Sequence, residues 1–229
     1  MKIAFLADIH SNIHALTEVL KKIDLIGVDN IFCCGDIVGY NSFPKECIEI
    51  LIDNKIKSSK GNHDKAVVDG NTSLFNEFGI AGVNLDRELL DEDEINFLDL
   101  LPNNKKFESD NVKFYIAHGS PRDNLYEYVL PWSSENYLKE ISMDVETDVI
   151  VLGHTHIQME VDVDGKLFLN PGSVGQPRDS IPKACFMVFD TNVKKAEWYR
   201  VSYDIDAATK ANMKNNLPVY SSKRLYLGK

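Results

Sequence analysis

The sequence predicts an α/β protein in which two β-sheets pack face to face and helices cover their outer faces. Three observations favour this fold. Short apolar runs alternate with helical patterns in the first third of the chain, which is typical of parallel strands with helices packed across them. The second half of the chain is richer in strands. The 229 residues, 44% of them apolar, show no internal repeat or linker, so one domain over residues 1–229 with a substantial core is the economical prediction.

The first third is predicted to contain three buried strands and two helices. The strands are short apolar runs at Lys2–Ala7, Asn30–Cys34 and, more weakly, Ile56–Ser59. Aliphatic residues at helical spacing predict a helix from Ile13 to about Ile23, with Asn12 as its cap. Pro44 is predicted to begin a second helix that runs through Ile52, because proline is tolerated in a first helical turn.

The segment Lys65–Asn104 is helical and acidic in its pattern. It is predicted to form two amphipathic helices that cover a sheet, one of them spanning Asp86–Leu101 and ending before Pro102. The segment separates two of the polar motifs described below. A second role as a wall or lid of a functional site therefore stays open.

The second half is predicted to be mainly strands. These strands are Val112–Ala117, Asp148–Leu152, Met159–Val163, Lys166–Asn170, Ala184–Asp190 and Glu197–Tyr203. Asp164-Gly165 is a strong hairpin turn signal between two of them. A short helix from Ile205 to about Asn215 and a polar C-terminal tail are expected to follow.

Composition narrows the class of protein. The net charge of −10 argues against a nonspecific nucleic-acid binder, whose affinity depends on Lys and Arg at phosphates. No apolar run reaches the length of a bilayer span, and the N-terminus lacks the zones of a signal peptide, so we expect a cytoplasmic protein. The spacing of the four cysteines indicates neither a zinc knuckle nor disulfides, and buried reduced thiols are expected.

Five short polar motifs hold five of the six histidines, and four of these motifs directly follow an apolar run. The motifs are Asp8-Ile-His10, Gly35-Asp36, Gly61-Asn62-His63-Asp64, His118-Gly119 and Gly153-His154-Thr155-His156. Carboxylate, amide and imidazole ligands gathered at strand ends suit a site for two divalent metal ions. The sequence therefore predicts hydrolysis of a phosphate ester.

Each motif taken alone has a structural explanation. Asp8 and His10 point to the same face of an extended strand end and can reach one metal, but a surface loop is the commoner case. Asp36 can equally be a turn residue or a carboxylate that bridges two ions. A single histidine such as His118 or His154 is more often a structural residue. The conjunction of all five motifs at successive strand ends favours the metal site.

The ordered set of motifs resembles the calcineurin-like metallophosphoesterase superfamily from Met1 to about Asp179. The segments 35–40, 118–121 and 170–179 resemble small prokaryotic phosphatases and phosphodiesterases within it. The resemblance implies a four-layer αββα sandwich, with the metals at the loops that follow the strands.

The resemblance also implies a role for each residue. The first metal would be held by Asp8, His10 and His156, and the second by Asn62, His118 and His154. Asp36 would bridge them, and a water or hydroxide shared by the two ions would attack phosphorus in line. His63 would be the general acid, with Asp64 a candidate for orienting it. The metals can be manganese, iron, zinc, cobalt or nickel, since such ligands accept all of them.

The chain departs from the protein serine/threonine phosphatases of the superfamily. Those enzymes carry Asp-Arg where this chain has Gly39-Tyr40, and glutamate where it has Asp64. The phosphate-clamping arginine is therefore missing, which disfavours a dedicated protein phosphatase. Arg178 can supply a guanidinium to the site in place of this missing arginine, or it can form a salt bridge within its loop. For Arg122 a structural role is favoured.

The leading hypothesis is therefore a hydrolase of small phosphate mono- or diesters, with neither a membrane nor long nucleic acid as its partner. Two alternatives stay open. The first is a catalytically silent scaffold of the same fold, since fold alone does not establish activity. The second is a nuclease, which the acidic balance disfavours. His14, the remaining histidine, is expected to face solvent on the first helix and to carry no chemistry.

Overall fold

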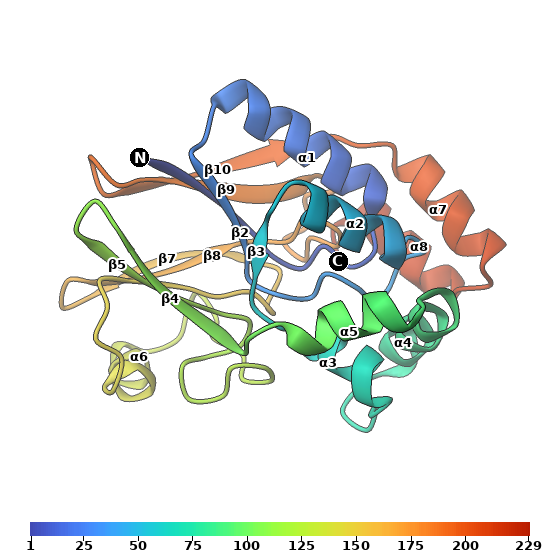
Figure 1. Cartoon of the computed structure of the whole chain (residues 1–229), viewed down its shortest axis with the longest axis horizontal. Helices are drawn as coiled ribbons and strands as arrows, with labels where there is room; N and C mark the ends of the chain where they lie inside the picture. The colour runs from blue at the N-terminus through green and yellow to red at the C-terminus, as the bar shows by residue number, and fades with distance from the viewer.

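Two mixed five-stranded sheets pack against each other in the computed structural model, which describes residues 1–229 (Figure 1). The first sheet has the order β10-β9-β1-β2-β3, with β10 Lys195–Val201, β9 Ala184–Asp190, β1 Lys2–Leu6, β2 Asn30–Cys33 and β3 Lys57–Ser58. The second has the order β4-β5-β6-β8-β7, with β4 Asn104–Ser109, β5 Val112–Ala117, β6 Val149–Val151, β8 Lys166–Pro171 and β7 Gln158–Val163.

Each sheet combines three adjacent parallel strands with two strands in antiparallel pairs. In the first sheet β1, β2 and β3 are parallel, while β9 runs antiparallel to β1. In the second sheet β5, β6 and β8 are parallel, while β4 and β7 are antiparallel to their neighbours. The carboxyl ends of parallel strands lie at one edge of a sheet, which is where α/β proteins gather functional loops.

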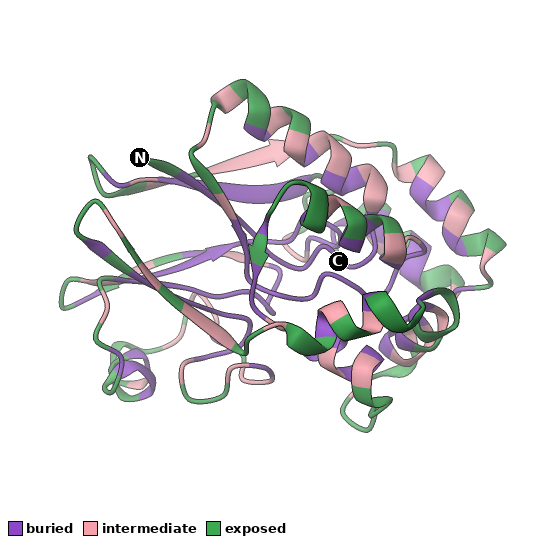
Figure 2. Ribbon diagram, viewed as in Figure 1, coloured by how far each residue is buried: buried purple, intermediate pink, exposed green.

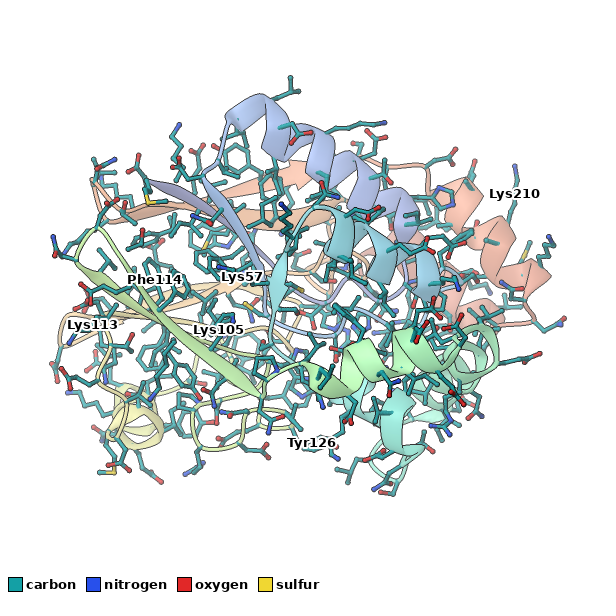
Figure 3. The ribbon with its side chains drawn as sticks, viewed as in Figure 1. Lys57, Lys105, Lys113, Phe114, Tyr126 and Lys210 are labelled. Atoms are coloured by element: carbon teal, nitrogen blue, oxygen red, sulfur yellow. The ribbon has the colours of Figure 1, made fainter.

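Three apolar clusters separate four layers and confirm the αββα sandwich. The first lies between the outer face of the first sheet and the helices α1 Ile13–Ile26, α2 Pro44–Asp53, α3 Asn62–Asp69, α4 Glu77–Leu89 and α5 Glu92–Leu100. The second lies between the sheets, where Phe114 contacts Phe5, Phe107 and Phe189 at ring-centroid distances of 5.8, 4.8 and 5.3 Å (Figure 3). The third packs helix α6 (Glu135–Ser142) on the second sheet.

The acidic segment forms three helices, so the prediction of two, with one over Asp86–Leu101, was wrong. The chain breaks at Leu90, which is extended with ψ 142°, and Asp91 then caps α5 by accepting from the amides of Asp93 and Glu94. The Glu94 side chain accepts from the Asp91 amide in return, which completes a capping box. This start signal is stronger than the leucine spacing that favoured one long helix.

The sequence also missed β4, α6 and the last helix. The segment expected to be a polar tail forms α8 (Val219–Leu227) beyond α7 (Ile205–Lys214), and α8 buries Ser221, Ser222 and Leu225. The buried face of α8 carries hydroxyl groups, so the sequence of this helix shows no apolar stripe that would predict it. The strand β4 has one neighbour and a largely polar sequence, which hides it from pattern analysis.

The remaining predicted elements are confirmed to within three residues at each end. Asp164 and Gly165 both have positive φ, at 54° and 82°, as a two-residue hairpin turn between β7 and β8 requires. The four cysteines are buried and free, as expected. No helix has the length and apolar character needed to cross a bilayer.

The loops that follow the parallel strands are buried, which is unusual for loops (Figure 2). Their backbone groups satisfy one another: Asp8 N donates to Gly35 O at 3.0 Å, and His10 N donates to Asp36 O at 3.0 Å. The loop after β8 joins them, because Gly175 N donates to Asp8 O at 2.9 Å. These hydrogen bonds tie the strand ends of the two sheets into one platform.

Helix α4 packs directly onto the loop after β2. A Cβ atom at Gly82 would overlap the backbone nitrogen of Tyr40, so only glycine permits this approach. Four residues along the helix, the buried Asp86 accepts from Gly39 N at 2.5 Å and from Ser11 Oγ at 3.2 Å. The acidic helices therefore fix the position of Tyr40.

Replacing Gly82 with alanine tests this contact. Alanine normally stabilises a helix by about 1 kcal/mol relative to glycine. Here overpacking against Tyr40 is expected to reverse the sign and destabilise the protein by about 1–3 kcal/mol, measured by chemical denaturation. The control is Gly79→Ala in the same helix, where the nearest atoms belong to the Phe75 side chain and can move. A Gly82→Ala variant as stable as the wild type would contradict the packing.

Candidate metal centre

All seven side chains that the sequence nominated as ligands lie at strand ends, buried, and converge at the junction of the two sheets. Asp8 and His10 follow β1, Asp36 follows β2, Asn62 begins α3 after β3, His118 follows β5, and His154 and His156 follow β6. The first sheet thus supplies four of these side chains and the second sheet three. The site exists only because the two sheets meet.

Possible ligand atoms lie within 4.8 Å of one another in three groups of three residues. One group is Asp8, His10 and His156, another is Asp36, His118 and His154, and a third, His10, Asp36 and His63, overlaps both. Asp36 lies between them, since its Oδ2 atom is 3.7 Å from His10 Nε2 and 3.2 Å from His118 Nε2. Asn62 Oδ1 joins the second group, 2.9 Å from His118 Nε2.

Four histidines each use one ring nitrogen to contact a backbone carbonyl. The pairs are His10 Nδ1 with Val38 O, His118 Nδ1 with Cys34 O, His154 Nε2 with Tyr126 O and His156 Nδ1 with Gln176 O. A carbonyl can only accept, so that nitrogen carries the proton in each ring. The other nitrogen is left with a lone pair that points into the site. This arrangement is the usual outer support of metal-binding histidines.

The inward nitrogens therefore face other acceptors. His10 Nε2 lies 3.1 Å from His156 Nε2, and His118 Nε2 lies 3.0 Å from His154 Nδ1. The Oδ2 atom of Asp8 is buried with no hydrogen-bond partner. Buried acceptors without donors are unfavourable unless a cation lies between them. The donor set thus fits divalent metal ions.

The pKa values of three histidines in the free site agree with this reading. Burial lowers the pKa of His154 to about 3 and those of His10 and His156 well below the ordinary value, so their inward nitrogens are unprotonated at neutral pH. His118 is the exception, because the Asp36 carboxylate overcomes the effect of burial and raises its pKa to about 9. In the free protein the inward nitrogen of His118 therefore carries a proton, which a metal ion would displace. Burial raises the pKa of Asp8 to about 7.

Backbone strain is concentrated at these ligands. Five of the seven have a left-handed backbone, with φ between 49° and 67°; they are Asp8, His10, Asp36, His154 and His156. Such a conformation costs a non-glycine residue about 1–2 kcal/mol. It turns the chain sharply at each strand end and aims the side chain at the centre. Strain of this kind clusters at functional sites.

His63 is held by aromatic rings and not by Asp64. Its ring packs against His10, Tyr40 and Phe75, at centroid distances of 4.8, 4.6 and 4.6 Å. Its Nδ1 atom is buried against Gly39 without a hydrogen-bond partner, which leaves Nε2 to face the pocket. Burial lowers the pKa of His63 to about 4.

The structure corrects the expected role of Asp64, which makes no hydrogen bond to the His63 ring. Its carboxylate instead accepts from four backbone amides, those of Asp36, Ile37, Val38 and Gly61, at 2.8–3.2 Å. Burial raises the pKa of Asp64 to about 6. Asp64 therefore fixes the loop that carries Asp36.

The two candidate arginines lie in different places. Arg178 lines the pocket, with its Nη2 atom 3.2 Å from Gln176 Oε1 and 3.5 Å from the Tyr40 hydroxyl. The structure does not bring Arg122 to the pocket, because Arg122 is exposed and forms ion pairs with Glu127 and Glu140.

His14 also lies outside the site. It is partly exposed on α1 and lines a surface groove, with its ring edge against Phe43 at 5.3 Å.

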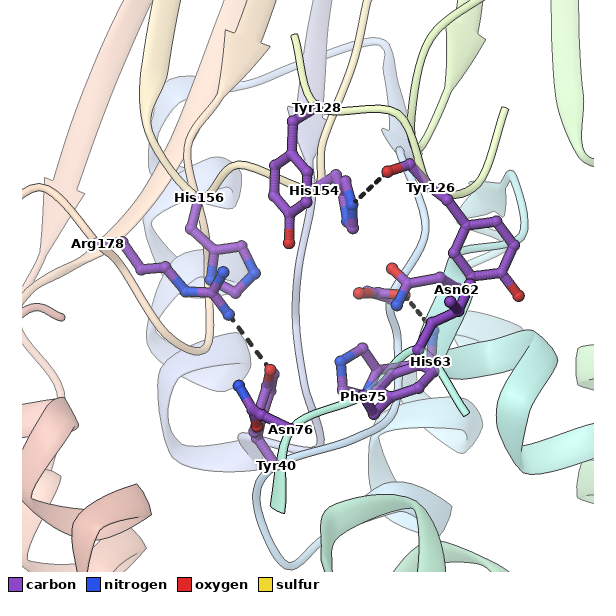
Figure 4. Close-up of a pocket in the computed structure, with 12 residues that line it drawn as sticks. Tyr40, Asn62, His63, Phe75, Asn76, Tyr126, Tyr128, His154, His156 and Arg178 are labelled. Atoms are coloured by element: carbon purple, nitrogen blue, oxygen red, sulfur yellow. Dashed lines mark hydrogen bonds between the residues drawn. The ribbon is translucent and has the colours of Figure 1, made fainter. Parts of the chain in front are cut away.

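A pocket of about 350 Å³ lies over the ligand cluster (Figure 4). Its walls come from the loop after β2, the start of α3, the loop between α3 and α4, and the loops after His118 and Gly172. Apart from the ligands, the lining residues are His63, Tyr40, Leu74, Phe75, Asn76, Tyr126, Tyr128 and Arg178. Tyr128 stacks on His154 at a centroid distance of 3.9 Å. The pocket is therefore polar at its base and aromatic on its walls.

Sequence reasoning named none of these aromatic residues as part of the site. Tyr40 directly follows Gly39 and lies four residues after Asp36, and Tyr126 and Tyr128 follow His118 within ten residues. That proximity to the motifs was the available signal. Phe75 gave no signal, because it lies in a helical segment with no motif nearby.

Comparison with known proteins agrees with the geometry. Residues 1–194 match the family model of the calcineurin-like phosphoesterase superfamily domain. An uncharacterised protein of Methanocaldococcus jannaschii is 37% identical over 245 residues, which covers 99% of this chain and 98% of the relative. A phosphodiesterase of the same organism is 27% identical over 172 residues, covering 75% of this chain and 83% of the relative.

A solved structure shows the same fold. The crystal structure of a metallophosphoesterase from Sphaerobacter thermophilus has a TM-score of 0.85 and 30% sequence identity to this chain, and covers 100% of this chain and 99% of its own. The similarity therefore extends beyond the segment that the family model matches and includes the C-terminal helices.

The role of Asp64 can be tested by Asp64→Asn. Asparagine has one acceptor oxygen, so at least two of the four amides lose their partner, at about 1–3 kcal/mol for each buried unsatisfied donor. We expect chemical denaturation to show a loss of several kcal/mol in the free energy of unfolding. The matched control is Asp69→Asn in the same helix, which breaks only the surface pair with Lys65, worth about 0–1 kcal/mol. Equal stability of the two variants would contradict the positioning role.

Proposed function

This chain belongs to the calcineurin-like phosphoesterase superfamily, and we propose that it is a two-metal enzyme that hydrolyses small phosphate mono- or diesters. The observation that carries the proposal is the cluster of buried carboxylate, amide and imidazole acceptors, among which only His118 has a proton to donate, at the base of a pocket that also contains His63 and Arg178. A scaffold protein would not need this costly arrangement. The phosphodiesterase among the relatives supports the same chemistry.

Two of the three groups share no residue, and they suggest one ion each. Asp8, His10 and His156 would hold the first, and Asn62, His118 and His154 the second, with Asp36 shared. When bound, two such ions activate water at neutral pH and stabilise the negative charge that develops on the phosphoryl oxygens. Imidazole, carboxylate and amide ligands suit manganese, iron, zinc, cobalt or nickel.

The protein's own residues then orient the ester and handle the proton. Arg178 provides a guanidinium that can bind phosphoryl oxygens by charge-assisted hydrogen bonds. The aromatic walls exclude water and position the organic part of the substrate. A pocket of about 350 Å³ suits a small ester better than a protein or duplex nucleic acid.

In this proposal His63 donates a proton from Nε2 to the leaving oxygen. Burial keeps its pKa near 4 in the free protein, so the ring is neutral at pH 7. A phosphate anion bound beside it favours the imidazolium and raises the pKa. The rings of His10, Tyr40 and Phe75 hold His63 in this position without needing a carboxylate partner.

The dependence of the rate on the leaving group tests both the function and the role of His63. Wild-type protein supplied with manganese is expected to hydrolyse 4-nitrophenyl phosphate and phenyl phosphate, and Asp36→Asn to abolish both activities. The variant His63→Gln should lower kcat for phenyl phosphate by about 10²–10⁴, the usual contribution of a general acid. For 4-nitrophenyl phosphate the loss should be far smaller, because a good leaving group needs no proton.

Two outcomes would contradict the account. Equal losses for both esters would mean that His63 does not act as the proton donor. No hydrolysis of any mono- or diester by wild-type protein with metal demonstrably bound would contradict the proposed function itself. His14→Gln is the matched control, because His14 lies outside the site and its replacement should leave both rates unchanged.

A further inference from the structure

Two guanidinium groups flank the ring of Tyr40 beside the pocket. Arg178 comes from the loop after β8, and Arg224 comes from α8 near the C-terminus. The Cζ atom of each lies 5.8 Å from the centroid of the Tyr40 ring. Figure 4 shows Arg178 reaching the Tyr40 hydroxyl on the side of the pocket opposite Tyr126.

The charges of this arginine pair are not balanced by acidic side chains. Neither guanidinium has a side-chain carboxylate within 4.0 Å, although the whole chain carries a net charge of −10. Asp179, the neighbour of Arg178 in sequence, pairs with Arg200 instead. Arg178 Nε is buried without any hydrogen-bond partner.

Arg224 is held at both of its neighbours. Its Nε atom donates to an oxygen of Lys229, the last residue, at 2.7 Å, and its guanidinium interacts with the Tyr40 side chain. Burial lowers the pKa of Arg224, and the nearby charge of Arg178 lowers it further. Two like charges near the same ring repel each other, and an anion that contacts both of them would relieve this repulsion.

Tyr40 connects the arginine pair to the reaction centre. Its ring is packed against both His10 and His63, at centroid distances of 4.8 and 4.6 Å. A leaving group protonated by His63 can therefore extend across Tyr40 toward Arg178 and Arg224. The pair lies where the far end of a leaving group would be.

The fold holds this arrangement rigidly. Ser180 N donates to Gly228 O at 2.8 Å, and a side chain at Gly228 would overlap Ile181, so the end of α8 is locked to the loop that carries Arg178. Asn212 of α7 bonds Asn41 and Ser42 and fixes the other side of Tyr40. Both helices lie beyond residue 194, where the family model ends. They add a feature that the shared superfamily core does not supply.

We propose that Arg178 and Arg224 bind a second phosphate group, carried by the leaving group, so that the preferred substrates are bisphosphates. This inference rests on the proposed phosphoesterase function. Guanidinium groups match the geometry of phosphate oxygens and bind them in pairs of parallel hydrogen bonds. One arginine is enough to orient the phosphate that reacts. The second guanidinium, the absence of acidic partners and the path over Tyr40 indicate a second anion.

A matched pair of substrates tests the proposal. Propyl phosphate and the bisphosphate of propane-1,3-diol differ only in the second phosphate. We expect kcat/KM of the manganese-loaded wild type to be about 10- to 100-fold higher for the bisphosphate, the range of charge-assisted hydrogen bonds to one anion. The variant Arg224→Gln should remove most of this preference, and Arg224→Lys should retain part of it. Arg122→Gln, a surface arginine outside the pocket, should keep the wild-type ratio.

Binding measured without turnover tests the second-phosphate site independently of catalysis. In calorimetry, wild-type protein is expected to bind propane-1,3-diphosphonate at least about tenfold more tightly than propylphosphonate, and Arg224→Gln to lose that difference. The comparison of the two ligands uses wild-type protein, so it does not depend on whether a variant folds. Thermal unfolding of Arg224→Gln shows whether α8 remains in place.

The outcomes separate the two proposals. Equal kcat/KM for the two propyl esters, or equal affinity for the two phosphonates, would overturn the second-phosphate site even if both esters were hydrolysed. No hydrolysis of either ester or of 4-nitrophenyl phosphate would instead contradict the phosphoesterase function. In that case the calorimetric ratio alone decides the arginine subsite.

Discussion

The structure depends on holding buried acceptor atoms within hydrogen-bond distance of one another with only the proton of His118 to share among them. His10 faces His156, and His118 faces His154, in each case through ring nitrogens whose partner nitrogens already donate to carbonyls. Asp36 lies between the two pairs. Such a cluster is unfavourable by itself, so the surrounding fold has to impose it. A pair of cations would turn the same cluster into a source of stability.

Several features of the fold hold this cluster of acceptor atoms in place. Left-handed backbone at five ligands turns the chain sharply where the strands end. Asp64 gathers four backbone amides and so fixes the loop of Asp36. Buried loops from both sheets hydrogen-bond to one another, and α4 closes over the loop that carries Tyr40. The αββα sandwich brings the carboxyl ends of the parallel strands of both sheets to the same edge. Neither sheet alone would gather all the ligands.

The ligands could be predicted from the sequence because metal coordination demands specific residue types at strand ends. Their surroundings could not. The predicted role of Asp64 was wrong because Asp64 is adjacent to His63 in the sequence, which suggested that the two side chains interact. Its actual partners are backbone amides, and these do not depend on which residue types carry them. Arg224 lies 184 positions after Tyr40 in the sequence, so no local pattern predicts that the two side chains lie together. By contrast, the break before α5 was readable, since Asp91 and Glu94 form a capping box.

The most direct test of the account is a crystal structure of the manganese-loaded protein, with anomalous scattering used to locate the metal. The account predicts two anomalous peaks on either side of Asp36, one among Asp8, His10 and His156, the other among Asn62, His118 and His154. A single peak, or metal bound away from these side chains while they still face one another, would contradict it.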